Sequence, residues 1–281
     1  MIAFDFAYFR PETLKEANET YKQLIIAGKL PLYYGGGTEI ISMARAGSIR
    51  FDAVIDIKSI PECNTLCVEN NQLIIGSAVT LTKIAESGCF PLLGKTVSRI
   101  ADHTIQDKIT IGGNIAGSII YREAALPLMI TNSKVKIIKK NKLHELPLLE
   151  IFDGNLHLQN GELIVQFLID TNYLNLSYCH VKKTKLDKID YPLITLAAIK
   201  TDNGINAAVS GLADKPFLLP VKILNEQDVP EAVRADKTVG AIQNNIIGDL
   251  IIAGKEYRMF VLKNVLVQMF ENFKEAQYAG I

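Results

Sequence analysis

The pattern of apolar and polar residues near the N-terminus predicts a strand, then a helix, then a second strand. Residues 2–6 alternate enough to predict a strand, and the apolar side chains of residues 14–25 then fall on one face of a helix that ends at Gly28. A second strand at residues 32–34 leads directly into consecutive glycines, and a short helix is expected at residues 40–46. This order predicts a small strand-helix-strand unit at the start of the chain.

The middle of the chain predicts a second unit of strands and helices. Two runs rich in branched aliphatic residues, 53–57 and 73–81, lie on either side of a polar turn around Asn70 and Asn71. The other elements expected here are helices at residues 82–87, 91–101 and 124–130 and strands at residues 134–140 and 163–169. This mixture favours a small α/β subdomain.

Beyond residue 170 the pattern predicts an antiparallel sheet. Strands are expected at residues 178–181, 194–200 and 205–210. Asn203-Gly204 between the last two is typical of a tight hairpin turn. Helical stretches at residues 230–236 and 257–273 would cover one face of this sheet, which is an α+β arrangement.

Composition narrows the class of protein. A chain of 281 residues lies between one large domain and two ordinary ones, and two are predicted. Its 30 basic residues equal its 30 acidic residues, so no summed field favours nucleic acid or an anionic membrane. No apolar run approaches the ~18 residues of a membrane helix, and Asp5 and Glu12 stand where a signal peptide is basic or apolar. A cytoplasmic protein is therefore expected.

The cysteines and histidines are few and scattered. Cys63 and Cys67 lack nearby histidine partners, which favours ordinary thiols over a metal site. The histidines lie far apart in the sequence and form no readable triad or ligand pair. No metal site, iron-sulfur cluster or catalytic side chain is therefore predicted in this chain.

Two glycine-rich segments interrupt the apolar pattern. The first is Gly35-Gly36-Gly37-Thr38-Glu39, and the second covers residues 110–118. Glycine lets main-chain N–H groups approach a ligand closely, so consecutive glycines can form a nest of donors for a phosphate. One such segment is more often a turn or bulge than a ligand site, but two in one chain favour a ligand. Neither segment fits the dinucleotide fingerprint or the P-loop.

Together these segments resemble the two pyrophosphate loops of the FAD-binding medium subunit of molybdenum hydroxylases, the xanthine dehydrogenase and carbon monoxide dehydrogenase family. The matching residues are Gly36-Gly37-Thr38-Glu39 and Thr110-Ile111-Gly112-Gly113-Asn114-Ile115-Ala116. The resemblance covers nearly the whole chain, including residues 53–57, residues 73–81 and Glu256-Tyr257-Arg258.

The resemblance implies an α+β fold of two domains. Residues 1–170 would form a FAD-binding domain of the PCMH/vanillyl-alcohol-oxidase type, with subdomains of about 1–55 and 56–170. Residues 171–281 would form a small C-terminal α+β domain, an antiparallel sheet with helices on one face.

It also implies the residues that contact FAD. The pyrophosphate donors would be Gly36, Gly37, Thr38, Gly112, Gly113 and Asn114. Tyr34, Gly35, Glu39, Ile40 and Thr110 would line the same cleft, with Ile115 and Ala116 against the flavin edge.

Glu123 and Lys182 complete this set of FAD contacts, and each also has an interpretation without a role at the cofactor. Counting from Asn114 places Glu123 at the family's ribose-binding acid, whereas counting back from Leu126-Pro127 places Ala124 there. A solvated acid at a helix start is the other interpretation of Glu123. Lys182 matches a basic residue that approaches the flavin from the second domain, and an ordinary surface lysine is its alternative.

The implied function is electron transfer through FAD, because flavin carries the redox chemistry and the protein only holds and tunes it. A molybdopterin-binding large subunit and a [2Fe-2S] small subunit would supply the electrons, and NAD or another acceptor would take them. The alternatives are a self-contained flavin oxidoreductase and a flavin-free structural subunit of the same fold. The latter is motivated by Gln106-Asp107, which stand where the family has an Arg-Asn pair.

Overall fold

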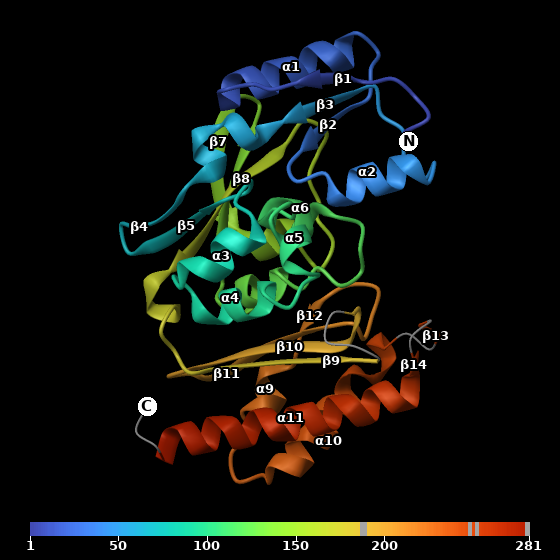
Figure 1. Cartoon of the computed structure of the whole chain (residues 1–281). Helices are drawn as coiled ribbons and strands as arrows, with labels where there is room; N and C mark the ends of the chain where they lie inside the picture. The colour runs from blue at the N-terminus through green and yellow to red at the C-terminus, as the bar shows by residue number, and fades with distance from the viewer. Residues whose placement is uncertain (186–189, 247–248, 251–252, 279–281) are drawn as a thin grey trace.

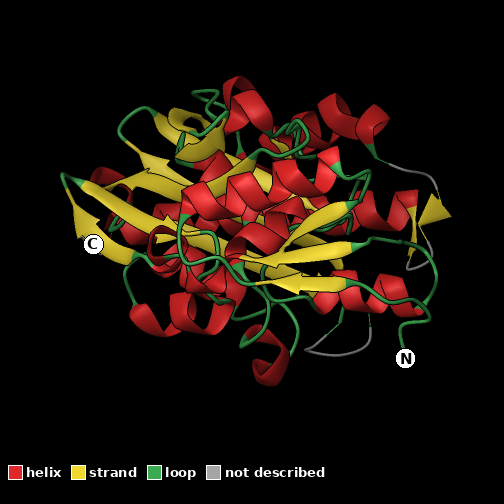
Figure 2. Ribbon diagram, turned by 90° about the horizontal axis from the view of Figure 1, so that it is seen from above, coloured by secondary structure: helices red, strands yellow, loops and turns green. Residues whose placement is uncertain are grey.

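Three layers follow the order of the sequence from top to bottom in Figure 1. The computed structural model describes residues 1–185, 190–246, 249–250 and 253–278. Seen from above, the layers lie over one another, so that helices and strands overlap in a single body (Figure 2).

The N-terminal layer is a parallel sheet of three strands with two helices. Its elements are β1 (Ala7–Phe9), α1 (Leu14–Ile26), β2 (Pro31–Tyr34), α2 (Thr38–Arg45) and β3 (Ala53–Asp56), and the strand order is β1-β3-β2. The Thr13 side chain caps α1 by accepting from the Glu16 N–H. The expected helix is confirmed, although Ile25, predicted on its buried apolar face, is 44% exposed.

The first strand begins later than the alternation of residues 2–6 predicts. Phe4 and Phe6 instead pack edge to face against Phe51, with ring centroids 5.3 and 5.0 Å apart. The chain pairs with β3 only from Ala7, which lies opposite Ala53. The prediction of a strand at residues 2–6 is therefore wrong. The apolar side chains there pack into an aromatic cluster, while the backbone does not pair with β3 before Ala7.

The central layer is an antiparallel sheet covered by short helices. It contains the 3₁₀ turns η1 (Ile57–Ser59) and η2 (Pro61–Asn64), the strands β4 (Leu66–Glu69), β5 (Gln72–Gly76), β6 (Lys134–Lys139), β7 (Lys142–Pro147) and β8 (Leu163–Asp170), and the helices α3 (Leu81–Ser87), α4 (Pro91–Val97), α5 (His103–Gln106), α6 (Ile111–Ala116), α7 (Ala125–Ile130) and α8 (Leu148–Ile151). The strand order is β4-β5-β8-β6-β7. Asn70 and Asn71 take φ values of 50° and 60° in the turn between β4 and β5, as expected for asparagine in a tight hairpin.

The C-terminal layer is the predicted antiparallel sheet with helices below it. Its elements are η3 (Thr171–Tyr173), β9 (Tyr178–Thr184), β10 (Pro192–Thr201), β11 (Gly204–Ser210), β12 (Phe217–Leu218), α9 (Val221–Leu224), α10 (Glu231–Ile242), η4 (Gln243–Asn245), β13 (Asp249–Leu250), β14 (Ala253–Gly254) and α11 (Lys255–Tyr278). The order β12-β11-β10-β9 confirms the expected strands and the hairpin at Asn203-Gly204. Figure 1 shows α9, α10 and α11 on the lower face of this sheet.

The upper face of this sheet packs on the central layer. Every residue of α7 is buried, and its apolar side chains share one core with Ala197, Ile199 and Ala208 of the C-terminal sheet. The sheet boundaries fall near the predicted divisions at residues 55 and 170, but this core crosses the second one. The division into separate domains stays a prediction.

None of the helices in the described ranges is both long enough and apolar enough to span a bilayer.

Candidate cofactor site

The two glycine-rich segments lie against each other. A Cβ atom added to Gly36 would stand 1.5 Å from the carbonyl oxygen of Lys108, and one added to Gly35 would stand 2.6 Å from Thr110 Oγ1. Real Cβ atoms essentially never approach other heavy atoms closer than 3.0 Å, so only glycine allows this contact. The absence of side chains brings the backbones of segments more than 70 residues apart into contact.

A carboxylate also ties the two segments together. Glu39 lies in the first turn of α2, and its Oε1 accepts hydrogen bonds from the backbone N–H and the hydroxyl of Ser118, at 2.6 and 2.5 Å. Gly117 lies so close that a Cβ atom there would be 2.5 Å from Glu39 Oε2. Glu39 therefore joins the start of α2 to the end of the second segment.

The first segment offers free backbone donors. Gly37 has a φ of 72° and precedes α2, with the Tyr34 ring packed beneath it. Within the described ranges, the structure records no acceptor for the N–H groups of Gly36, Gly37 and Thr38. This is the arrangement that an anion such as a diphosphate requires.

The second segment differs from its prediction. Residues 111–116 form helix α6, and its N–H groups already have protein acceptors. Gly112 donates to Ser77 O at 2.9 Å, Gly113 to Thr110 Oγ1 at 3.1 Å, and Asn114 to Thr110 O at 2.9 Å. The expected nest of free donors does not form here, because the Thr110 cap and the neighbouring Ser77 strand end take these N–H groups.

The side chains of the second segment are also partly committed elsewhere. Asn114 Oδ1 accepts from the Ala124 N–H at 3.2 Å and so holds the start of α7. Ile115 is fully buried in the central core, and its position against the flavin edge stays a prediction. Ala116 is exposed.

Glu123 and Lys182 form a buried ion pair. Lys182 Nζ lies 3.0 Å from Glu123 Oε2 and donates to Arg99 O at 2.7 Å, while Thr195 Oγ1 donates to Glu123 Oε1 at 2.5 Å. The side chains are 2% and 5% exposed, so both alternatives, the surface lysine and the solvated acid, are wrong. The resemblance implied a position near the flavin for each residue separately. The structure shows that the two side chains contact each other between the central and C-terminal layers.

Burial controls protonation around this pair. Desolvation raises the pKa of the Glu123 carboxyl above its usual value, although Lys182 and Thr195 act in the opposite direction. Desolvation, with smaller contributions from the charges of Arg99 and Lys182, also lowers the pKa of His180 to about 4. His180 is therefore neutral near pH 7.

Sequence reasoning missed a second lysine at the site. Lys58 Nζ donates to Gly35 O at 2.8 Å, pairs with Asp56 Oδ2 at 2.7 Å and lies 4.4 Å from the centroid of the Tyr34 ring. Tyr8 donates its hydroxyl to the same carboxylate at 2.5 Å. A signal that could have revealed this lysine is the expected parallel pairing of the two strands. Their carboxyl ends, Tyr34 and Asp56, then lie side by side at one edge of the sheet, next to Lys58.

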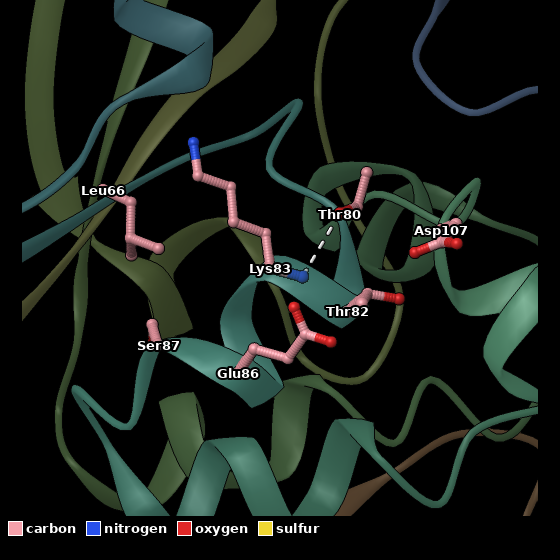
Figure 3. Close-up of a pocket in the computed structure, with 7 residues that line it drawn as sticks. All are labelled: Leu66, Thr80, Thr82, Lys83, Glu86, Ser87 and Asp107. Carbon is pink, nitrogen blue, oxygen red and sulfur yellow. Dashed lines mark hydrogen bonds between the residues drawn. The ribbon is translucent and has the colours of Figure 1, made fainter.

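Two hollows lie beside α3. The first, of about 490 Å³, has Lys83, Glu86 and Asp107 around it, and the Lys83 N–H donates to Thr80 Oγ1 at 3.3 Å (Figure 3). The second, of about 400 Å³, is lined in part by Arg99, whose carbonyl binds Lys182. Their size alone does not make them the cofactor site, which we place at the glycine segments on chemical grounds.

The described residues include no group of three or more His, Cys, Asp or Glu side chains that could hold a metal ion. The cysteines are free thiols, with Cys63 and Cys179 buried.

Comparison with known proteins decides the family. Residues 4–169 match the model of the FAD binding domain in molybdopterin dehydrogenase. The chain belongs to this family. FAD is therefore its cofactor, and its relatives are subunits of oxidoreductases.

Two relatives are dehydrogenase subunits. The nicotinate dehydrogenase FAD-subunit of Eubacterium barkeri is 27% identical over 178 residues, which cover 59% of this chain and 58% of that subunit. The match thus spans less than two thirds of the relative's length. The caffeine dehydrogenase subunit beta of Pseudomonas sp. (strain CBB1) is 24% identical over 225 residues, or 69% of this chain and 73% of that one.

Solved structures confirm the fold. A chain of carbon monoxide dehydrogenase from Hydrogenophaga pseudoflava superposes with a TM-score of 0.86 at 18% identity, covering 97% of this chain and 98% of that chain. The α+β architecture implied by the sequence is therefore confirmed over nearly the full length, including the C-terminal layer beyond the family match.

The residues at the glycine segments fit an FAD diphosphate. Gly36 leaves no room for a Cβ atom, and the N–H groups beside it have no recorded acceptor in the described ranges. Donors without recorded acceptors in a run of consecutive glycines suit an anion that approaches the backbone closely.

Proposed function

We propose that this chain is the FAD-binding electron-transfer subunit of a molybdenum hydroxylase-type dehydrogenase. The observation that carries the proposal is the joined pair of glycine segments, with backbone donors at Gly36, Gly37 and Thr38 facing no acceptor in the described part of the chain. FAD supplies the redox chemistry when bound, and the chain binds, orients and screens it.

The two segments would have different tasks. The first would donate hydrogen bonds to the diphosphate, with Tyr34, Glu39 and Ile40 beside it. The second would give close access through Gly112 and Gly113, because Gly113 is exposed and carries no side chain. Glu123 and Lys182 would stand at the border of the C-terminal layer, where Lys182 Nζ binds both Glu123 and Arg99 O.

The proposal includes partners. FAD in this chain would receive electrons from a [2Fe-2S] small subunit, which in turn would take them from a molybdopterin-binding large subunit. NAD or another acceptor would then oxidise the flavin. Names such as "FAD-subunit" and "subunit beta" among the relatives support an assembly of several chains.

Replacing Gly113 with valine tests the FAD site. A branched side chain there would block close approach of the diphosphate, so Gly113→Val should purify without FAD while keeping its fold by circular dichroism. Gly240→Val controls for the branched side chain itself, because nothing lies within 4 Å of its Cβ position, and the melting temperature of Gly113→Val shows whether its Cβ atom, 2.9 Å from Thr110 Oγ1, disturbs the cap of α6. Stoichiometric FAD in Gly113→Val would show that the diphosphate lies elsewhere.

Purification from the native cell tests the partnership. A tagged chain should bring with it an iron-sulfur protein and a larger molybdenum protein, in constant ratio through size exclusion. A chain that always elutes alone and reduces an acceptor directly from an organic substrate would be a self-contained flavin oxidoreductase. A colourless chain inside the same complex would be the flavin-free structural subunit.

A further inference from the structure

Lys58 contacts the first glycine segment from the side of the parallel sheet. Its Nζ is 2.8 Å from the carbonyl oxygen of Gly35, and its side chain is 40% exposed. The ammonium group also lies over the ring of Tyr34, the residue that packs beneath Gly37. Lys58 therefore touches the segment at the point where β2 ends and the free donors begin.

The Gly35–Gly36 peptide unit can point in two directions. In a trans peptide the C=O and the following N–H point to opposite sides of the chain. A glycine on each side removes the Cβ contacts within the chain that normally restrict the orientation of such a peptide. If it flipped, a carbonyl oxygen instead of the Gly36 N–H would face an approaching phosphate.

Lys58 binds this peptide by its carbonyl end. Because the Gly35 oxygen points at the ammonium group, the Gly36 N–H points away from it. No acceptor for that N–H is recorded among the residues the structure describes. The contact thus selects the peptide orientation in which the donor is available to a ligand.

Asp56 fixes Lys58 in this position. The carboxylate is 2% exposed and accepts from the Lys58 backbone N–H at 2.9 Å and from its Nζ at 2.7 Å. Tyr8 donates to the second of these oxygens at 2.5 Å. A lysine held at both ends of its side chain loses most of the freedom that makes a surface lysine a weak binder.

We propose that Lys58 is a positioning residue for diphosphate binding, which holds the Gly35–Gly36 peptide with its N–H directed to the cofactor. This inference rests on the proposed FAD site. It adds to that site a cation from η1, held by a carboxylate at the end of β3, outside both glycine segments.

The test is an FAD titration of the full-length apo-protein, followed by flavin fluorescence. Lys58→Met keeps the apolar stem on Tyr34 and removes the ammonium group. It should bind FAD about ten- to hundredfold more weakly, the effect expected for a lost hydrogen bond to a charged group. Lys58→Arg, which keeps a cationic donor, should recover most of the affinity.

Lys139→Met is the matched control. Lys139 pairs with Glu162 at 2.8 Å with side-chain exposures of 38% and 8%, close to the 40% and 3% of Lys58 and Asp56. Melting temperatures of all apo-proteins check that folding is comparable. If Lys58→Met does not fold, Lys58→Gln replaces it in the same comparison.

The outcomes are distinct. If the unchanged chain binds no FAD, the proposed site is overturned and this inference with it. If the chain binds FAD and Lys58→Met binds it as tightly, the site stands and the role of Lys58 is overturned. Equal loss in Lys58→Met and Lys139→Met, or no recovery in Lys58→Arg, would likewise overturn that role. Selective loss with recovery by arginine supports it.

Discussion

Two lysine–carboxylate pairs in this molecule have similar distances and buried carboxylates, but their lysines differ in exposure. Lys58 lies 2.7 Å from Asp56 and Lys182 lies 3.0 Å from Glu123. The Lys58 side chain is 40% exposed, whereas that of Lys182 is 2% exposed. The first pair stands at the edge of the parallel sheet, and the second is enclosed between the central and C-terminal layers.

The two carboxyls respond in opposite directions. Burial opposes ionisation of Asp56, but hydrogen bonds from Lys58 and Tyr8 outweigh it and the pKa is lowered below the usual value. At Glu123 burial is the larger effect, and the pKa is raised despite Lys182 and Thr195. The comparison shows that the protein environment, more than the presence of a lysine partner, decides whether an ionised carboxyl is favoured.

The largest expected effect comes from breaking the enclosed pair. At a pH above the folded pKa of Glu123, where its carboxyl is ionised, Lys182→Met leaves that charge buried without its cation, which typically costs about 3–5 kcal/mol of unfolding free energy. Urea unfolding of the apo-protein measures the loss. Lys182→Met combined with Glu123→Gln should restore a substantial part of it, because no uncompensated charge remains. If Lys182→Met alone is as stable as the unchanged chain, the pair is not enclosed as described.

The next effect is a dependence on pH. The raised pKa means that folded Glu123 keeps its proton at pH values where the unfolded chain, near 4.5, has lost it. Stability should therefore fall as pH rises from about 4.5 through the folded pKa, by at most about 1.4 kcal/mol per pH unit. Unfolding curves of the unchanged chain and Glu123→Gln at several pH values should converge below this window and separate above it.

Asp56→Asn gives the opposite sign as a control. The folded pKa of Asp56 lies below its usual value of 3.8, so its stabilising effect is present above that value and is lost as pH falls. The unchanged chain should thus lose its advantage over Asp56→Asn in acid. The same trend for both carboxyls would contradict the contrast between the two pairs.

The smallest effect is expected from the hydrogen bond that the Tyr8 hydroxyl donates to Asp56. Tyr8→Phe removes the hydroxyl that donates to Asp56, while the Lys58 contacts remain. Because the Tyr8 residue is 56% exposed, the loss should be near the low end for a hydrogen bond, about 0.5 kcal/mol. Thermal unfolding measures it, with Tyr173→Phe, at a weaker 3.5 Å contact, as the control. A loss well above this value would mean that the Tyr8 hydroxyl stabilises Asp56 more strongly than its exposure implies.

Local pattern was enough to predict most of the strands and longer helices. Periodicity identified α1 and the β10–β11 hairpin, because their apolar spacing and turn residues agree with the tertiary structure. It did not predict α6, since Gly112 and Gly113 disfavour a helix intrinsically. There the Thr110 cap and the contact with Ser77 override propensity, and neither is visible in a local window.

The charged pairs could not be predicted from spacing. Glu123 and Lys182 are 59 positions apart, and their meeting depends on how the C-terminal sheet packs on the central layer. Lys58 is close to Asp56 in sequence, but its contact with Gly35 follows from the register of two parallel strands. The family resemblance pointed to Glu123 and Lys182 individually, and nothing in the sequence indicated that they form a pair.

The core shared by α7 and the C-terminal sheet bears on how the protein can be divided for expression. The family match ends at residue 169, yet Ala197, Ile199 and Ala208 belong to the same apolar cluster as α7. A recombinant fragment cut at that boundary would present the buried side chains of α7 to water and should aggregate. We therefore expect a soluble flavoprotein only from a recombinant chain that extends past residue 169 and includes the C-terminal sheet.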